Sequence, residues 1–280
     1  MDPGGPRPGG LTPRVPPSGR RLLPPAGTCD IGAGVPGTAP APVSHRVAAS
    51  TGRPTIAAVT EDQPLPRPFR DEALGSFAER LASAEPVPGG GSASAVAASL
   101  AASLVSMVAR LSQDRPKYAD HAGLHIEATA AGLRLARRCL DLADEDARAY
   151  GVFAAALKMP RQTDEEIGAR RGAMQAAARR AAEVPLACVE ACLEIAGYAE
   201  ALAGRSNVNA GSDVVVAALL AEAAARGAGQ NVLVNLPATG DGSFEGVMTA
   251  RLDGLLDETE RLASRAREVV GGGQSRDPLP

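Results

Sequence analysis

The 280-residue sequence contains no tryptophan, and only 2% of its residues are aromatic. A core without large rings must be built from small side chains, and alanine supplies much of the 45% hydrophobic content. Alanine has the highest helix propensity, and β-branched or aromatic residues are not gathered into the alternating runs that indicate strands. The composition therefore predicts an all-α protein with closely packed helices.

Neither sign of charge dominates the chain. The 29 lysine and arginine residues against 32 acidic residues give a formal net charge of −3, and the sequence pI is near 5.7. Such a chain has no broad positive field for binding nucleic acid or an anionic membrane. We therefore expect a small molecule or a protein as the partner, with no nucleic acid and no membrane.

Cysteine is scarce, and its spacing does not indicate a disulfide framework. The four residues are Cys29, Cys139, Cys188 and Cys192. They are typical of small buried hydrophobic residues in a reducing compartment, which favours the cytoplasm. Cys188 and Cys192 lack further ligands nearby, and His121 with His125 lacks a third, so we expect no metal site and two solvated histidines.

The first 68 residues differ in composition from the rest. They hold 15 of the 23 prolines, no aromatic residue, and seven arginines against four acids. Such a segment cannot build a core, so we expect residues 1–68 to form a disordered Pro/Gly/Arg-rich tail. It has neither the continuous apolar run of a secretory signal nor a periodic amphipathic face.

Residues 69–272 carry apolar side chains at helical spacing, which predicts one antiparallel bundle of about five to six helices. The predicted helices cover residues 69–81, 92–112, 117–159, 163–204, 213–236 and 243–269. The third predicted helix can be broken near Gly123 or Gly132, and Pro185 should kink the fourth helix. Residues 273–280 should fray. Residues 92–111 are long and apolar enough to be considered as a membrane-spanning helix. Their five serines and many alanines instead favour a helix buried in the bundle.

Several helix starts carry capping signals. Thr163 with Glu166 has the form of a capping box, and we expect Ser92 and Ser212 to cap their helices. Asp213 then lies in the first turn of its helix, where the helix dipole favours an acid.

The turn from Pro88 to Ser92 contains three consecutive glycines, Gly89, Gly90 and Gly91. Glycines let a backbone approach another group closely, and the N–H groups of the helix that follows can receive an electron-rich ligand group. No Gly-Lys-Ser/Thr follows and no strand precedes, so the turn is neither a Walker loop nor a dinucleotide fingerprint. A ligand site and a tight turn between helices both fit it.

Asp146 falls on an apolar stripe of the third helix, with Leu142 and Phe153. Burial there would raise its pKa and suit it to moving protons, and structural pairing is the alternative. Asp144 lies about 200° away around the helix, so we expect it to face water or to pair with Arg148.

Polar residues also gather at the two ends of the fifth predicted helix. Asn207, Ser212 and Asp213 precede or begin it, where capping and ligand binding both fit. Asn231 and Asn235 sit one turn apart at its far end, where amides can hydrogen-bond a heterocycle or cap the helix.

Several segments taken together resemble the cyclodeaminase domain of formiminotransferase-cyclodeaminase and the related bacterial methenyltetrahydrofolate cyclohydrolases. They occur in the family's order: residues 77–81 before 88–92, then 106–108, 144–147, 156–160, 184–186, 212–213 and 231–236. The resemblance covers about Asp71 to Arg267, nearly everything outside the tail.

The resemblance implies a helical bundle, usually dimeric, with a tetrahydrofolate derivative as substrate and no tightly bound cofactor. Its activities are hydrolysis of the 5,10-methenyl bridge to 10-formyltetrahydrofolate, and closure of 5-formiminotetrahydrofolate with loss of ammonia. Carried onto this chain, it implies Asp146 and Lys158 as catalytic residues. The implied substrate-binding residues are Gly89, Gly90, Gly91, Ser92, Asn207, Ser212, Asp213 and Asn235.

One feature of the family is missing. The mammalian-type enzyme is thought to use a histidine as acid, and no histidine stands near Leu133, where we expect that position. We therefore favour the cyclohydrolase reaction, with cyclodeamination as the alternative. A catalytically inactive bundle that binds folate or a protein is the third reading.

Overall fold

The computed structural model describes residues 67–279, and these contain helices and no strand. The α-helices are α1 (Leu74–Leu81), α2 (Gly90–Ser112), α3 (Ala122–Leu157), α4 (Asp164–Leu202), α5 (Gly211–Asn235) and α6 (Gly242–Gly271). Short 3-10 helices are η1 (Phe69–Asp71), η2 (Pro116–His121), η3 (Val208–Ala210) and η4 (Leu236–Thr239). The all-α prediction is confirmed, while residues 1–66 of the expected tail lie outside the described residues.

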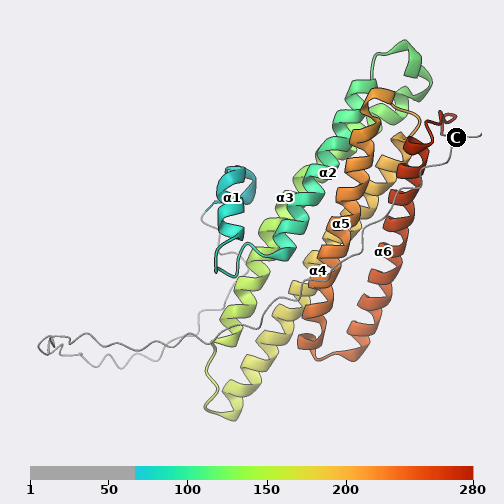
Figure 1. Cartoon of the computed structure of the whole chain (residues 1–280). Helices are drawn as coiled ribbons and strands as arrows, with labels where there is room; N and C mark the ends of the chain where they lie inside the picture. The colour runs from blue at the N-terminus through green and yellow to red at the C-terminus, as the bar shows by residue number, and fades with distance from the viewer. Residues whose placement is uncertain (1–66, 280) are drawn as a thin grey trace, which may run out of the picture. The chain divides into compact units, whose positions relative to one another are not determined.

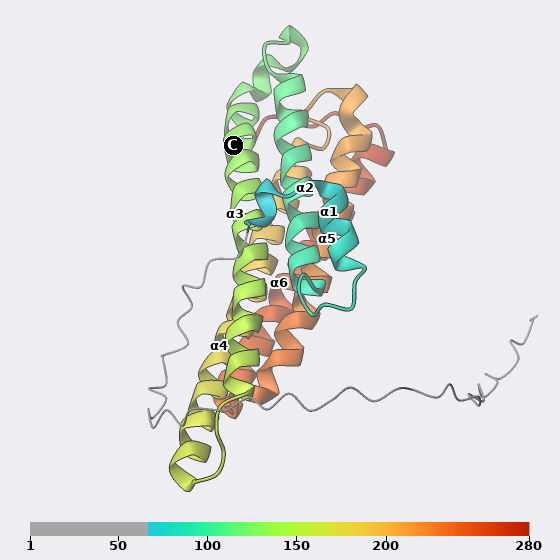
Figure 2. The ribbon, with the colours of Figure 1, turned by 90° about the vertical axis from the view of Figure 1, so that its left-hand side faces the viewer.

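The five long helices α2 to α6 form an antiparallel bundle (Figure 1). Helix α2 packs against α3 and α5, and α4 packs against α3, α5 and α6. Each link between successive long helices is short, so neighbours in sequence are neighbours in space (Figure 2). The core is the thin one that the composition predicts, because most of its buried side chains are alanine.

Small residues let α2 and α3 approach closely. A Cβ atom at Gly132 of α3 would lie 2.7 Å from the carbonyl oxygen of Ala102 and 2.8 Å from the amide nitrogen of Ser106, both in the α2 backbone. Helix α3 runs unbroken through Gly132. Of the two positions at which the sequence allowed a break in this helix, the structure has the break beside Gly123, where η2 ends and α3 begins. Helix α4 likewise continues through Pro185.

The capping predictions have mixed outcomes. The Thr163 hydroxyl group accepts a hydrogen bond from the Glu166 amide, and the Glu166 carboxylate accepts one from the Thr163 amide, which confirms the capping box. The predictions for Ser92 and Ser212 are wrong. Helix α2 begins at Gly90 and α5 begins at Gly211, so each serine lies inside its helix. Asp213 does occupy the first turn of α5.

The chain after α6 folds back onto the end of α4. The Arg276 amide donates to the Gly204 carbonyl at 3.0 Å, and the Arg276 guanidinium donates to the Glu200 carbonyl at 3.0 Å. Residues 273–280 were expected to fray, whereas the backbone and the guanidinium group of Arg276 hold this segment against residues 200–204, a distant part of the chain.

Cys139, Cys188 and Cys192 are buried and free, and burial raises the pKa of the Cys139 thiol to about 12. Cys29 lies outside the described residues. Within residues 67–279 no group of three or more histidine, cysteine or acidic side chains is placed to hold a metal ion. The thiols there pack as small hydrophobic groups.

Two helical stretches of the described chain, Gly90–Ser112 and Val208–Thr239, are long and apolar enough to span a membrane. The apolar window of the first is 61% buried among its neighbours, as a bundle helix should be, whereas that of the second is 39% buried. Part of the apolar surface of α5 is therefore left uncovered by the other residues of the 67–279 segment.

The close α2–α3 contact gives a stability prediction. Gly132→Ala should lower the free energy of unfolding by about 1–3 kcal/mol, because the added methyl group meets backbone atoms that cannot move aside. Gly151→Ala is the matched control in the same helix, since nothing lies within 4 Å of its Cβ position. It should raise stability by about 0.5–1 kcal/mol. Urea unfolding checks both, and equal stability of the two variants would contradict the packing described.

Candidate active site

The Gly-rich turn and Asp146 meet at one cavity of about 270 Å³ near the N-terminal end of α2. Its walls come from the turn before α2 and from α3, α4 and α5. The lining residues are Pro86, Val87, Gly89, Gly90, Gly91, Asp146, Tyr150, Phe153, Ala181, Asn231, Val234 and Asn235. One side of the cavity is thus backbone of the turn, and the rest is a mixture of polar and apolar side chains.

Gly91 is required for this arrangement. A Cβ atom at Gly91 would overlap with the carboxyl group of Asp146. Gly91 is therefore the glycine whose missing side chain lets the α3 carboxyl group reach the first turn of α2. At Gly90 the same added atom would make only an ordinary contact, 3.5 Å from the Asn231 amide nitrogen.

Asp146 is held by Ser92 and is partly buried. The Ser92 hydroxyl group lies 3.0 Å from Asp146 Oδ2 and 3.2 Å from the Ala143 carbonyl oxygen. Burial raises the pKa of the Asp146 carboxyl group above its ordinary value, while hydrogen bonds from the Ser92 side chain and backbone lower it and offset part of the rise. A carboxyl group with a raised pKa that opens onto a cavity is suited to taking up and releasing protons.

Two amides of α5 line the same cavity as Asp146. Asn231 donates through Nδ2 to the Gly227 carbonyl at 2.9 Å, and Asn235 donates to the carbonyls of Ala181 at 2.9 Å and Asn231 at 2.7 Å. Within residues 67–279 the side-chain oxygen of neither amide accepts a hydrogen bond. With Val87, Phe153 and Val234 beside them, these acceptors fit a flat heterocycle that carries N–H groups.

The other predicted site residues lie away from this cavity. Lys158 is the exposed C-cap of α3, about 18 Å beyond Asp146 at 1.5 Å per residue. The Asn207 amide bonds to Ser112 Oγ at the C-terminal end of α2, and Ser212 and Asp213 begin α5 at that same end. Since α2 is about 33 Å long, these three residues do not share a cavity with Asp146 within one chain.

Two predictions about polar side chains of α3 are wrong. Asp144 neither faces water nor pairs with Arg148. It is 4% exposed, and its Oδ1 atom accepts a hydrogen bond from the Phe69 amide at 2.9 Å. The spacing of the sequence placed it opposite Asp146 correctly, but did not reveal that η1 covers that side of α3.

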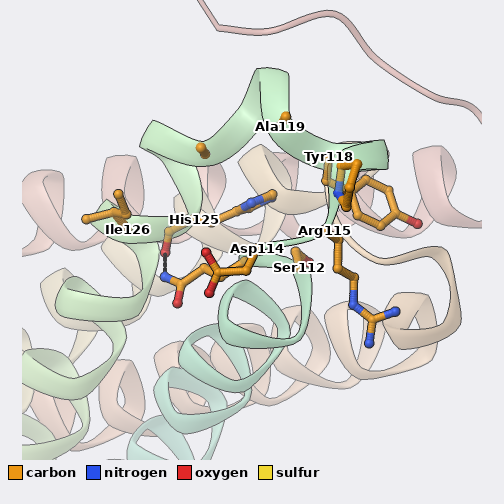
Figure 3. Close-up of a pocket in the computed structure, with 10 residues that line it drawn as sticks. Ser112, Asp114, Arg115, Tyr118, Ala119, His125 and Ile126 are labelled. Atoms are coloured by element: carbon orange, nitrogen blue, oxygen red, sulfur yellow. Dashed lines mark hydrogen bonds between the residues drawn. The ribbon is translucent and has the colours of Figure 1, made fainter.

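His125 is not a surface histidine. It is 1% exposed, and its Nε2 atom lies 2.9 Å from the Arg205 carbonyl oxygen. Because a carbonyl group accepts, Nε2 is the donor of this hydrogen bond. His125 lines a second cavity, of about 440 Å³, together with Asp114, Arg115 and Tyr118 (Figure 3). No feature of the sequence pointed to this cavity at the C-terminal end of α2.

Comparison with known proteins gives one consistent result. Residues 73–254 match the family model described as formiminotransferase-cyclodeaminase. A methenyltetrahydrofolate cyclohydrolase from Methylorubrum extorquens is 38% identical over 202 residues, which cover 71% of this chain and 96% of that protein. The formimidoyltransferase-cyclodeaminase of Sus scrofa is 32% identical over 196 residues; these cover 68% of this chain, which spans only 35% of that relative.

A solved structure agrees with these sequence matches. The crystal structure of a formiminotetrahydrofolate cyclodeaminase from Thermotoga maritima superposes with a TM-score of 0.67 at 27% identity, covering 72% of this chain and 98% of that one. The matched family range contains the Gly-rich turn, Asp146 and Asn235, so it includes the whole smaller cavity.

Proposed function

The chain belongs to the formiminotransferase-cyclodeaminase family, and on that basis we propose that it hydrolyses 5,10-methenyltetrahydrofolate to 10-formyltetrahydrofolate. The observation that carries the proposal is the cavity that a protonatable carboxyl group, Asp146, shares with two amide oxygens that accept no hydrogen bond within residues 67–279. The cyclohydrolase relative, matched over nearly its whole length, supports the choice of reaction. Three buried free thiols accord with the cytoplasm as its compartment.

The reaction needs one group that moves a proton twice. In its ionised form Asp146 takes a proton from a water molecule, and the oxygen of that water bonds to the methenyl carbon between N5 and N10. Asp146 then gives the proton to N5 as the bond between carbon and N5 breaks. The hydroxyl proton of the adduct passes to solvent, so the cationic substrate and one water yield 10-formyltetrahydrofolate and one proton. The raised pKa of Asp146 suits it to both steps.

The cavity binds the pteridine end of the substrate in this proposal. The free side-chain oxygens of Asn231 and Asn235 accept from the ring N–H and amino groups, and the turn from Gly89 to Ser92 closes over the ring. A volume of about 270 Å³ holds the bicyclic ring, while the benzoylglutamate part extends beyond it. The substrate is a tetrahydrofolate derivative, with no separate cofactor.

Cyclodeamination of 5-formiminotetrahydrofolate is the second candidate, supported by the structural likeness to the Thermotoga maritima enzyme. Loss of ammonia requires a proton donor for the departing nitrogen. No histidine is among the cavity's lining residues, and the nearest titratable groups are Asp146 and Tyr150. The hydrolytic reaction, which one carboxyl group can serve, is therefore preferred.

Asp146→Asn should lower kcat for loss of the methenyl absorbance by at least about 100-fold, because the amide cannot take up the proton. In the wild-type protein, activity should fall on acidification as Asp146 becomes protonated. Because the pKa of Asp146 is raised, the acidic limb of the pH–activity profile should have its midpoint above the ordinary aspartate pKa of about 3.9. Asp253→Asn, an exposed change on α6, is the matched control and should keep full activity.

The outcomes separate the readings. Full activity of Asp146→Asn would remove the assignment of the residue, whereas a wild-type protein that converts neither methenyl- nor formimino-folate would remove the enzymatic proposal. Calorimetric binding of tetrahydrofolate without turnover would then favour a folate-binding bundle.

A second copy of the chain is the proposed protein partner. Exposed apolar side chains form one face of α2 and α5: Leu100, Met107, Leu111, Val216 and Leu219. Helix α2 has no charged residue from Gly90 to Ala109, and α2 packs beside α5. Faces of this kind on helical proteins are typical of homodimer interfaces.

A two-fold axis perpendicular to α2 would also place Ser212 and Asn207 of one copy near the Gly-rich turn of the other. The two groups of sequence-predicted residues would then meet across the interface.

Leu100→Glu combined with Met107→Glu should convert a dimer into a monomer, because two charges on each copy would be buried at the interface. Light scattering after gel filtration should give twice 28.4 kDa for the wild-type chain and 28.4 kDa for the variant. Leu74→Glu, at a site that is 72% exposed on α1, is the control and should leave the dimer intact. A monomeric wild-type protein, or its sedimentation with membranes, would contradict the proposal.

A further inference from the structure

One turn of α3 holds both ends of the segment from Phe69 to Ser92. At the beginning, the Asp144 carboxyl group accepts the hydrogen bond of the Phe69 amide at 2.9 Å. At the end, the Ser92 hydroxyl group meets the Ala143 carbonyl at 3.2 Å and the Asp146 carboxyl group at 3.0 Å. The acids on either side of Glu145 therefore anchor opposite ends of the same stretch of chain.

This stretch, residues 69–92, is called the strap below. It contains η1, α1 and the turn whose residues Pro86, Val87 and Gly89–Gly91 form a wall of the candidate active site. Figure 1 shows α1 at one side of the bundle, beside α2 and α3. Of the α1 side chains only Phe77 is buried, while Leu74 is 72% exposed. The strap is thus anchored at both ends by hydrogen bonds and between them by Phe77 and Val87, which pack against the core.

The first part of the strap is held together by contacts among its own side chains. The rings of Phe69 and Phe77 make an edge-to-face contact with their centroids 5.4 Å apart, and the Arg80 guanidinium lies 5.5 Å from the Phe69 ring centroid. Arg80 also pairs with Glu72 at 2.9 Å. A displacement of Phe69 is therefore passed along α1 toward Pro86 and the cavity wall.

Asp144 itself does not line the cavity. Two residues before Asp146 on a helix, it points to the opposite side of α3, and Glu145 between them pairs with Arg138 and Arg180. A carboxyl group that is 4% exposed carries a desolvation cost, and Asp144 accepts its hydrogen bond from the Phe69 main chain. The hydrogen bond that Asp144 accepts fixes the position of Phe69, where the strap begins, and this offsets the cost of burial.

We propose that Asp144 is a positioning residue: by holding Phe69 it sets the place of the Pro86–Gly91 wall, and so the affinity of the cavity for the pteridine ring. The inference rests on the proposed function for the identity of the ligand. It assigns to the first acid of the Asp144-Glu145-Asp146 run a role in binding and to the third a role in proton transfer.

The test compares Asp144→Ala with Asp144→Asn. Alanine removes the acceptor for the Phe69 amide, whereas the asparagine side-chain oxygen can replace it. Asp144→Ala should raise KM for methenyltetrahydrofolate about tenfold. Its kcat and the pH of its acidic limb should stay unchanged, because the carboxyl group that transfers the proton is intact. Asp144→Asn should keep KM within about twofold of the wild type.

A second variant and a second measurement make the test independent of folding and of turnover. Arg80→Ala loosens the strap from its exposed side, outside the cavity, and should raise KM in the same direction as Asp144→Ala. Hydrogen exchange should show faster exchange of residues 69–81 in Asp144→Ala and not in Asp144→Asn, with α3 still protected. The dissociation constant of 5-formyltetrahydrofolate, a stable analogue, reports affinity without chemistry.

Three results would overturn the inference: a strap that exchanges no faster in Asp144→Ala, a loosened strap with unchanged KM and dissociation constant, or an Asp144→Asn variant as impaired as Asp144→Ala. If Asp144→Ala does not fold, unchanged KM in Arg80→Ala overturns it. A wild-type protein without turnover would instead count against the proposed function, while exchange and analogue binding would still decide the role of Asp144.

Discussion

The candidate site depends on the approach of the Asp146 carboxyl group to the first turn of α2, where Gly91 has no side chain to block it. This single contact joins a chemical group on α3 to a backbone turn that precedes α2. It also places the carboxyl group beside the N–H groups of a helix start, which favour the ionised form, while burial favours the neutral form. The balance of the two leaves an acid whose protonation can change during a reaction.

The alanine-rich composition makes this approach feasible. In a bundle with bulky core residues, helices lie farther apart and a short aspartate side chain cannot reach across. Here Gly132 brings α2 and α3 into backbone contact, and the cavity at the end of this pair is small. On α2 the buried positions carry small side chains, and the larger apolar side chains, such as Leu100 and Met107, lie on the exposed face. Composition thus connects the core, the site and the surface proposed for a second copy.

Much of the fold could be predicted from the sequence, because helical periodicity and capping signals are local. The capping box at Thr163 and the first-turn position of Asp213 are of this kind. The environments of Asp144 and His125 could not be predicted, since each is decided by a distant segment: Phe69 covers Asp144, and the Arg205 carbonyl meets His125. At the site, the Gly-rich turn, Asp146 and Asn235 line one cavity, as the sequence suggested. Asn207 lies at the other end of α2, and this distance could not be predicted, because the sequence does not show which helix ends lie together.

The most direct test is a crystal structure of the protein with 5-formyltetrahydrofolate. The account predicts the pteridine ring between the Gly89–Gly91 turn and Asn235, with the Asp146 carboxyl group within hydrogen-bond distance of the N5 region. A ring bound instead in the cavity beside His125 and Tyr118, with Asp146 contacting no ligand atom, would contradict it.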